Sequence, residues 1–207
     1  MKVRGKPLTR KSVFIPMGIE ENQPNLADEG MTLFRQRRFK EAAEKLEKAI
    51  DLEPEKVSLW NLHAQALANT GDYDEALKSV EVATALDDSN HLNWQLKGTI
   101  LMRKGDLEES KKAIDKSLEL NESSVNYTFR GQVDYSLQNY DEAMGFFEEA
   151  LKRDSDNPLA NQMKGLVLFI KGKHVEAVPF IEKALAVGSS ESLKKILEEC
   201  RKKAETG

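Results

Sequence analysis

A fixed spacing of small and bulky apolar residues recurs five times along the chain. A small residue begins each copy, at Ala42, Ala76, Ser110, Ala143 and Ala177, with intervals of 34, 34, 33 and 34 residues. A bulky apolar residue follows four positions later, at Leu46, Val80, Ile114, Phe147 and Ile181. Another small residue comes three positions after that, at Ala49, Ala83, Ser117, Ala150 and Ala184. Steps of four and three keep these side chains on one face of a helix, so each copy predicts an amphipathic helix.

A second pattern lies upstream of each predicted helix. Its small residue stands at Gly30, Ala64, Gly98, Gly131 and Gly165, and Leu33, Leu67, Leu101, Asp134 and Leu168 follow three positions later. Glycine in a helix interior costs about 1 kcal/mol relative to alanine, so its recurrence predicts that another helix packs closely against it. Turn signals lie between the two patterns at Gly71, Gly105 and Gly172. Each copy is therefore predicted to be a helix, a turn and a second helix.

Five copies with this spacing resemble tetratricopeptide repeats. They span residues 23–56, 57–90, 91–123, 124–157 and 158–189. The family's early tryptophan, its turn aromatic and its repeat-ending proline are matched by Trp60 and Trp94, by Tyr73 and Tyr140, and by Pro54. Arg37 and Gln138 depart from the pattern because they replace the turn glycine. The resemblance implies an all-α, right-handed superhelical solenoid of antiparallel helix pairs, with about eleven helices.

The segments outside the repeats differ in charge and pattern. Residues 1–22 are predicted to be a disordered basic tail, in which Lys2, Arg4, Lys6, Arg10 and Lys11 give residues 1–19 a charge of +5. An alternative is that residues 12–18 dock as an extended peptide along the acidic body of the same or a neighbouring molecule. Residues 190–207 are predicted to be a capping helix and a frayed end, with an apolar stripe at Leu193, Ile196, Leu197 and Cys200. Cys200 is interpreted as a core side chain rather than a reactive thiol.

Composition narrows the class of protein. Charged residues make up 32% of the 207 residues and no run of about 18 apolar residues occurs, so no membrane span is predicted. The first 19 residues lack the apolar core of a secretory signal, and a single cysteine allows no internal disulfide, so we expect a cytoplasmic protein. The residues after position 19 carry −9, the total of −4 less the +5 before it. This negative charge is expected to repel the phosphates of nucleic acids, so no nucleic-acid partner is predicted.

Sequence motifs for catalysis and cofactor binding do not occur. The chain has no G-x-G-x-x-G, G-x-x-x-x-G-K, H-E-x-x-H or G-x-S-x-G. His63, His91 and His174 have no carboxylate or cysteine partner at ligand spacing on their own helices. We therefore predict no enzyme, no cofactor and no metal site. Asp134, where other copies have leucine, is interpreted as a structural salt-bridge partner of Arg130, with a one-residue register error or a ligand-contacting acid as alternatives.

The resemblance implies a concave binding groove lined by outward-facing residues of each first helix. The positions that the family uses correspond to Met31, Phe34, Arg35, Asn61, Gln65, Asn69, Gln95, Thr99, Met102, Arg103, Gln132, Tyr135 and Gln162, with Thr128 on the same surface. The amides suit the backbone of an extended peptide because each donates and accepts hydrogen bonds. Arg35 and Arg103 are predicted to contact anions, and Met31, Phe34, Met102 and Tyr135 to take apolar side chains. The alternative is that the amides are ordinary surface residues.

The resemblance also bears on which partners fit. A chaperone-type carboxylate clamp needs lysines that this chain lacks, since Ala27 and Met31 stand at its first pair of positions, so no such clamp is predicted. Two functions remain open. The first is a non-catalytic scaffold or adaptor that binds a protein or peptide partner in the groove. The second is an assembly subunit that docks or weakly self-associates through its end faces, the tail, or the apolar residues Leu166, Phe169 and Ile170.

Overall fold

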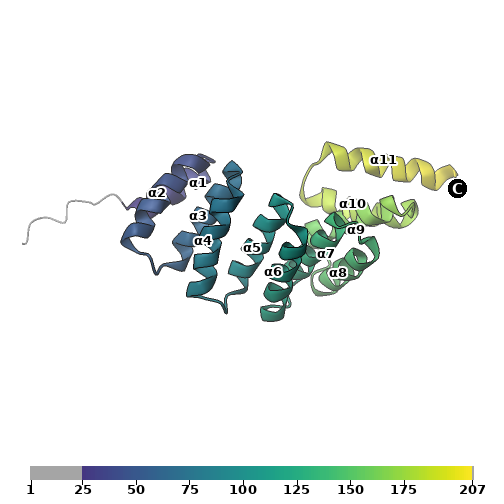
Figure 1. Cartoon of the computed structure of the whole chain (residues 1–207). Coiled ribbons are helices and arrows are strands. Elements are labelled where there is room, and N and C mark those ends of the chain that lie inside the picture. The colour runs from purple at the N-terminus through teal and green to yellow at the C-terminus, as the bar shows by residue number, and fades with distance from the viewer. Residues whose placement is uncertain (1–24, 207) are drawn as a thin grey trace, which may run out of the picture.

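The computed structural model describes residues 25–206, which form eleven α-helices joined by short turns (Figure 1). In chain order these are α1 (Leu26–Arg35), α2 (Phe39–Leu52), α3 (Val57–Thr70), α4 (Tyr73–Leu86), α5 (His91–Lys104), α6 (Leu107–Leu120), α7 (Ser124–Ser136), α8 (Tyr140–Arg153), α9 (Pro158–Ile170), α10 (His174–Val187) and α11 (Glu191–Thr206). The predictions for the basic tail, residues 1–22, lie outside the described residues. The repeat boundaries drawn from the sequence stay predictions.

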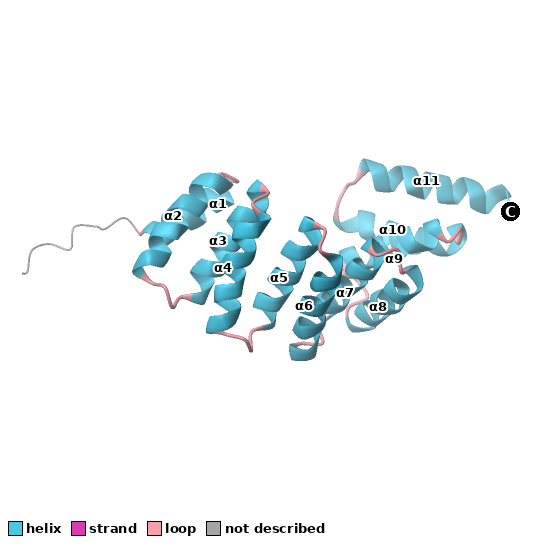
Figure 2. Cartoon of the chain, viewed as in Figure 1, coloured by secondary structure: helices cyan, strands magenta, loops and turns pink. Residues whose placement is uncertain are grey.

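The helices stack one after another into an elongated array (Figure 1). The two helices of each pair pack against each other, and the second helix of a pair packs against the first helix of the next. Figure 2 shows only helices, turns and loops across residues 25–206. The predicted all-α solenoid of antiparallel helix pairs is confirmed. No helix in the described range is both long and apolar enough to cross a membrane.

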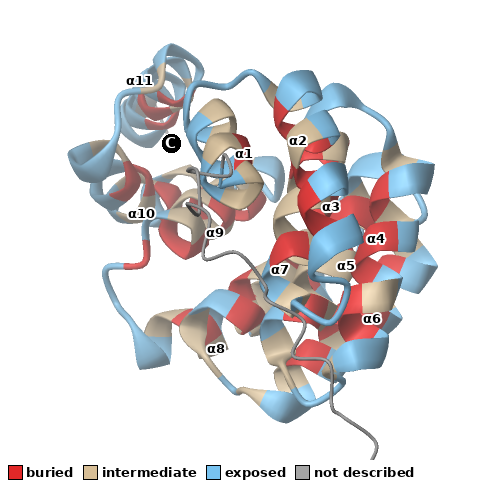
Figure 3. Ribbon diagram, turned by 90° about the vertical axis from the view of Figure 1, so that its left-hand side faces the viewer, coloured by how far each residue is buried: buried red, intermediate tan, exposed pale blue. Residues whose placement is uncertain are grey.

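The small-residue stripe lies where the two helices of a pair meet. Figure 3 shows buried residues on the helix faces that are turned toward one another. A Cβ added at Gly98 would lie 2.5 Å from the side chain of Ile114, and one at Gly131 would lie 2.5 Å from that of Phe147. Both distances are shorter than carbon atoms tolerate without a shift. The close helix approach predicted from the recurring glycines is confirmed.

The turns inside the helix pairs require a left-handed backbone. Gly71, Gly105 and Gly172 have φ angles of 93°, 101° and 73°. Arg37 and Gln138 occupy the same place in the first and fourth repeats, with φ angles of 62° and 64°. A side chain in this region costs roughly 1–2 kcal/mol, because its Cβ crowds the following carbonyl oxygen. These two repeats therefore keep the turn geometry at some loss of stability.

Buried asparagines join successive repeats. Asn93, near the start of α5, donates through Nδ2 to the carbonyl oxygens of Ala83 at 3.0 Å and Asp87 at 2.8 Å. In the same way, Nδ2 of Asn126 donates to carbonyl oxygens of α6 and of the loop before α7, and Nδ2 of Asn161 donates to carbonyl oxygens of the loop before α9. Because carbonyl oxygens only accept, each of these amides is held in one orientation. The bonds fix where each repeat begins relative to the one before it.

Asp134 lies at the joint between α6 and α7. Its buried carboxylate pairs with Arg130 one turn earlier, and Arg130 also pairs with Asp115 of α6. Lys111 of α6 lies 3.7 Å from the other oxygen of Asp134. A charge in a protein interior needs such partners. The salt-bridge interpretation is confirmed, and burial keeps this carboxylate from contacting a ligand.

Helix α11 covers the C-terminal end of the array. The hydroxyl of Ser190 accepts a hydrogen bond from the Leu193 N–H at 3.4 Å, as an N-cap does. Leu193, Leu197 and Cys200 are buried against α9 and α10. Burial raises the pKa of the Cys200 thiol, which favours the protonated, unreactive form. The prediction that Cys200 is a core side chain is confirmed.

Candidate peptide-binding groove

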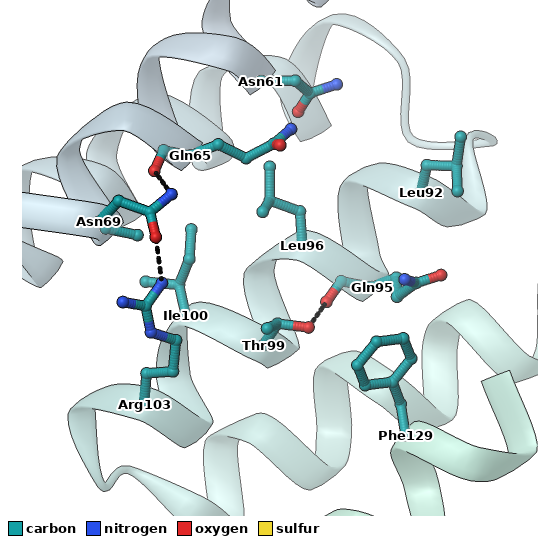
Figure 4. Close-up of a pocket in the computed structure, with 11 residues that line it drawn as sticks. Asn61, Gln65, Asn69, Leu92, Gln95, Leu96, Thr99, Ile100, Arg103 and Phe129 are labelled. Atoms are coloured by element: carbon teal, nitrogen blue, oxygen red, sulfur yellow. Dashed lines mark hydrogen bonds between the residues drawn. The ribbon is translucent and has the colours of Figure 1, made fainter. Parts of the chain in front are cut away.

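A cavity of about 430 Å³ opens among α3, α5 and α7 (Figure 4). It is lined by Asn61, Gln65, Ala68, Asn69, Leu92, Gln95, Leu96, Thr99, Ile100, Arg103 and Phe129, and we call it the central groove. On α5 the lining residues Leu92, Leu96, Thr99 and Arg103 follow at steps of four, three and four. This spacing turns one face of α5 toward the cavity along most of its length.

The central groove combines an apolar floor with amide side chains. Figure 4 shows Leu96 at its centre, with Gln65 on one side and Gln95 and Phe129 on the other. The side-chain amides of Gln65 and Gln95 make no hydrogen bond with other residues of the described chain. Each amide keeps two N–H donors and an accepting oxygen available. A segment lying in the groove therefore meets apolar contacts below it and hydrogen-bonding groups beside it.

A neighbouring repeat sets the orientation of Asn61. Its Nδ2 donates to Oδ1 of Asn93 at 2.7 Å, and Asn93 must present this oxygen because its own Nδ2 bonds two carbonyls. Oδ1 of Asn61 is consequently turned away from Asn93. It is buried and has no donor among residues 25–206. An acceptor left in this state costs about 1–3 kcal/mol.

A small residue on α3 keeps the groove open. Ala68 holds the position that Phe34 holds one repeat earlier and Tyr135 holds two repeats later. Phe34 packs edge-on against Phe39, with 5.3 Å between ring centroids, and Tyr135 packs against Tyr140 at 5.7 Å. Burial raises the pKa of the Tyr135 phenol, and Tyr140 adds to the shift. In these repeats the aromatic side chain fills the space that Ala68 leaves empty.

The guanidinium of Arg103 lies over the ring that Ala68 leaves uncovered. It is 5.5 Å from the centroid of Tyr73. Figure 4 shows its contact with Asn69, in which Nη1 lies 3.5 Å from Oδ1. Asn69 in turn donates to the carbonyl oxygen of Gln65 at 2.9 Å, which orients its amide. No carboxylate of the described chain forms an ion pair with Arg103. The charge is therefore held in place without being neutralised.

The predicted groove residues fall into two groups. The central groove brings together Asn61, Gln65, Asn69, Gln95, Thr99 and Arg103. Outside it lie Met31, Phe34, Arg35, Met102, Gln132, Tyr135 and Gln162. Met31 and Arg35 are exposed on α1, with Nη2 of Arg35 3.2 Å from the sulfur of Met31, and the other five are partly buried. Their part in binding stays a prediction.

Apolar residues of the groove were not predicted from the sequence, and one prediction is corrected. Leu92, Leu96 and Phe129 line the cavity, although only the polar positions beside them had been assigned to it. Leu96 and Phe129 stand 33 residues apart at equivalent positions, and this recurrence was the available signal. Thr128 was expected on the surface but is buried, because Asn157, the N-cap residue of α9, covers it and donates to its hydroxyl at 3.3 Å.

The histidines make contacts typical of packed side chains. His63 is 2.9 Å from the hydroxyl of Ser79, and burial lowers its pKa. His91 is 2.9 Å from Nδ2 of Asn121. The ring of His174 lies 5.5 Å from that of Phe169. Within residues 25–206, no three His, Cys, Asp or Glu side chains gather as metal ligands would.

Sequence comparison finds one family. A profile described as tetratricopeptide repeat matches residues 27–91 and 130–191. A second profile with the same description matches residues 93–124. Together the two profiles cover well over half of the chain. No curated protein matches the sequence.

Several solved structures have the same arrangement of helices. PilW, described as a widely conserved type IV pilus biogenesis factor, is 16% identical with a TM-score of 0.77, over 87% of this chain and 84% of PilW. TTC0263, a thermophilic TPR protein in Thermus thermophilus, is 18% identical with a TM-score of 0.70, over 85% and 97%. YrrB, described as a TPR protein with an unusual peptide-binding site, is 18% identical with a TM-score of 0.61, over 84% and 90%. Identities this low show a shared fold alone.

Proposed function

The chain belongs to the tetratricopeptide repeat family, whose fold is generally a protein-interaction scaffold, and we propose that it is a non-catalytic adaptor. In this proposal it binds an extended segment of a partner protein in the central groove. The cytoplasmic location expected from the sequence stays a prediction, as does the identity of the partner.

The composition of the central groove carries the proposal. Gln65 and Gln95 hold unused amides, and Leu96 and Phe129 lie between them as an apolar floor. An extended peptide exposes N–H and C=O groups along its whole length, and amides satisfy both. Apolar side chains of the peptide leave water when they pack on the floor. YrrB, which shares this fold, is described as having a peptide-binding site, and that supports a peptide as the class of ligand.

Peptide selection with a groove variant and a matched control tests the proposal. The groove variant carries Asn61→Ala, Gln95→Ala and Arg103→Glu. The control carries three changes at exposed positions of α2, namely Glu44→Ala, Glu47→Ala and Lys48→Glu. Circular dichroism first establishes that all three proteins are equally helical. Each is then used to select from a random dodecapeptide library, and the enriched peptides are synthesised and titrated by fluorescence anisotropy.

We expect the wild type and the α2 control to bind the same peptides, and the groove variant to bind them at least tenfold more weakly. Tenfold corresponds to about 1.4 kcal/mol, a modest share of what a few buried contacts contribute. Equal binding by all three proteins would show that the central groove is not the working surface.

The alternative, an assembly subunit, rests on the apolar residues at the end of α9. Ile170 is 45% exposed, whereas Leu166 and Phe169 are partly buried against the C-terminal cluster. The apolar area available for docking there is therefore small, which favours the adaptor. Sedimentation velocity over a hundredfold range of concentration distinguishes the two, because an assembly subunit of this kind would increase in mass.

A further inference from the structure

We propose that the central groove selects partner segments in which a carboxylate lies about three to five residues from a bulky apolar side chain. The carboxylate binds Arg103, and the apolar side chain packs on Leu92, Leu96 and Phe129. This inference rests on the proposed function, because it specifies the chemistry of the segment that the groove binds. A side-chain carboxylate and a free C-terminus supply the same group, and the experiment below separates them.

The pairing of charges around Arg103 leaves its positive charge for a ligand. Lys104, the next residue, lies 3.0 Å from Asp74 and 3.0 Å from Asp106. These two carboxylates raise the pKa of Lys104 through their hydrogen bonds, Asp74 first. Asp74 and Asp106 are therefore paired with the lysine. Arg103 is left with aromatic and amide neighbours, which orient a guanidinium without supplying a counter-charge.

The contacts of Arg103 leave most of its donors free. A guanidinium has five N–H groups, and the amide oxygen of Asn69 engages one edge at 3.5 Å. Tyr73 supports the flat face of the group rather than its edges. The planar fork of donors matches the two oxygens of a carboxylate, which it holds through paired hydrogen bonds. A fixed arginine of this kind prefers a carboxylate to a neutral amide.

The distance along α5 sets the spacing of the two features in the ligand. Leu96 and Leu92 precede Arg103 by seven and eleven residues. At 1.5 Å of rise per residue, the apolar floor lies about 10–16 Å from Arg103 along the helix axis. An extended peptide advances about 3.3–3.6 Å per residue, so about three to five residues bridge this distance.

The two ends of the groove offer different hydrogen-bonding groups. At the Arg103 end the guanidinium keeps free N–H donors beside the amide of Asn69. At the other end, beside Asn93, Oδ1 of Asn61 is a buried acceptor that lacks a donor in the described chain. A ligand with its carboxylate on Arg103 supplies the missing counter-charge, whereas the reversed placement gives Arg103 none.

The test uses the full chain and two random dodecapeptide libraries, one with free C-termini and one with blocked C-termini. Wild type, Arg103→Gln, Arg103→Glu and Lys48→Glu are compared, the last being a matched charge reversal at an exposed position of α2. Peptides enriched by the wild type are synthesised with each Asp or Glu changed to Asn or Gln, and with the C-terminus amidated. Their affinities are measured with wild type and with Arg103→Gln.

We expect the wild type and Lys48→Glu to enrich the same acidic peptides, and Arg103→Glu to lose this preference. Arg103→Gln should weaken acidic peptides about five- to tenfold, while the neutral version of each peptide binds both proteins equally. Sensitivity to Glu→Gln assigns the carboxylate to a side chain, and sensitivity to amidation assigns it to a C-terminus. Either result supports the inference.

Two kinds of result would refute the inference, and only the second would also refute the proposed function. Groove-dependent peptides without an acidic preference, or with an acidic preference that Arg103→Gln leaves unchanged, would refute the inference while the proposed function stands. The groove variant defined above, which carries Asn61→Ala, Gln95→Ala and Arg103→Glu, is titrated with the same peptides. Peptides that bind it as well as they bind the wild type would refute the proposed function and the inference together.

Discussion

The second and fourth repeats use two neighbouring positions of their first helices in opposite ways. The second repeat has Leu67 and Ala68 there, and the fourth has Asp134 and Tyr135. Asp134 is buried in an ion pair, and Tyr135 packs edge-on against Tyr140. Leu67 packs among apolar residues, and Ala68 lines the central groove. The same scaffold is thus filled by its own side chains in one repeat and left open in the other.

The comparison shows that an open groove depends on side-chain size at one position as well as on the backbone. Phe34 and Tyr135 are partly buried and contact the next aromatic of their own repeats. Where alanine takes this place, Tyr73 remains accessible to Arg103 of the following repeat. Substitutions at these positions should therefore either remove or increase the difference between the open second repeat and the filled fourth repeat.

The largest effect is expected for the buried ion pair of the fourth repeat. Asp134→Ala should lower the free energy of unfolding by about 3 kcal/mol, because it leaves Arg130 buried with only part of its counter-charge. The double variant Arg130→Met, Asp134→Leu should recover most of this loss by replacing both charges with apolar groups. Urea denaturation measures both. A loss below about 0.5 kcal/mol for the single variant would contradict the structural role.

Opening the fourth repeat tests whether Tyr135 is structural. Tyr135→Ala should lower the free energy of unfolding by about 2 kcal/mol, less than for a fully buried ring because Tyr135 is only partly buried. Its contact with Tyr140 contributes to the loss. Binding of peptides selected with the wild type should not change. Lost affinity at unchanged stability would place Tyr135 in the binding site instead.

Closing the second repeat is the converse experiment. Ala68→Phe should place a ring where Phe34 has one in the first repeat, cover Tyr73 and displace Arg103. We expect at least tenfold weaker peptide binding, about 1.4 kcal/mol, and a loss of stability of roughly 1–3 kcal/mol, because Ala68 is 3% exposed and a ring adds volume to its packed surroundings. Ala186→Phe, at an exposed position of α10, is the matched control and should bind as the wild type does. Full affinity in Ala68→Phe would mean that the groove does not need this space.

Substitutions at the positive-φ turn positions of the two repeats should change stability in opposite directions. Gln138→Gly in the fourth repeat should stabilise by roughly 0.5–1 kcal/mol, because glycine adopts the positive φ of 64° without strain. Gly71→Gln in the second repeat should destabilise by a similar amount, since its φ is 93°. Thermal denaturation of the two variants provides the comparison. The same sign of change in both would rule out backbone strain as the cause.

The smallest effect is expected in the titration of Tyr135. Burial raises the pKa of its phenol above the ordinary value near 10. The stability that this raised pKa reflects is fully present below the unfolded pKa and is lost as pH rises through the folded one. The ultraviolet difference between wild type and Tyr135→Phe isolates this phenol during an alkaline titration. An ordinary pKa would indicate that the ring is better solvated than its packing implies.

The periodicity of the sequence determined the fold. Side chains that share one helix face recur at steps of three and four, and a recurrence of 33–34 residues marks a unit that packs only on its neighbours. Helix pairs, their turns and the buried stripe at Ala42, Leu46 and Ala49 follow from these local rules. Glycine at positions such as Gly98 indicated close helix packing, because a Cβ there would lie 2.5 Å from the side chain of Ile114.

Only the tertiary structure decided which residues form the central groove. Ala68, Arg103 and Phe129 come from three repeats, and their meeting depends on the rotation of each repeat relative to the last. That rotation arises from interlocking side chains and interrepeat bonds such as Asn61 to Asn93, not from a period within one helix. The same packing buried Thr128, which the helical register alone had placed outside. A sequence pattern reports neighbours on one helix, whereas a binding site needs neighbours across several.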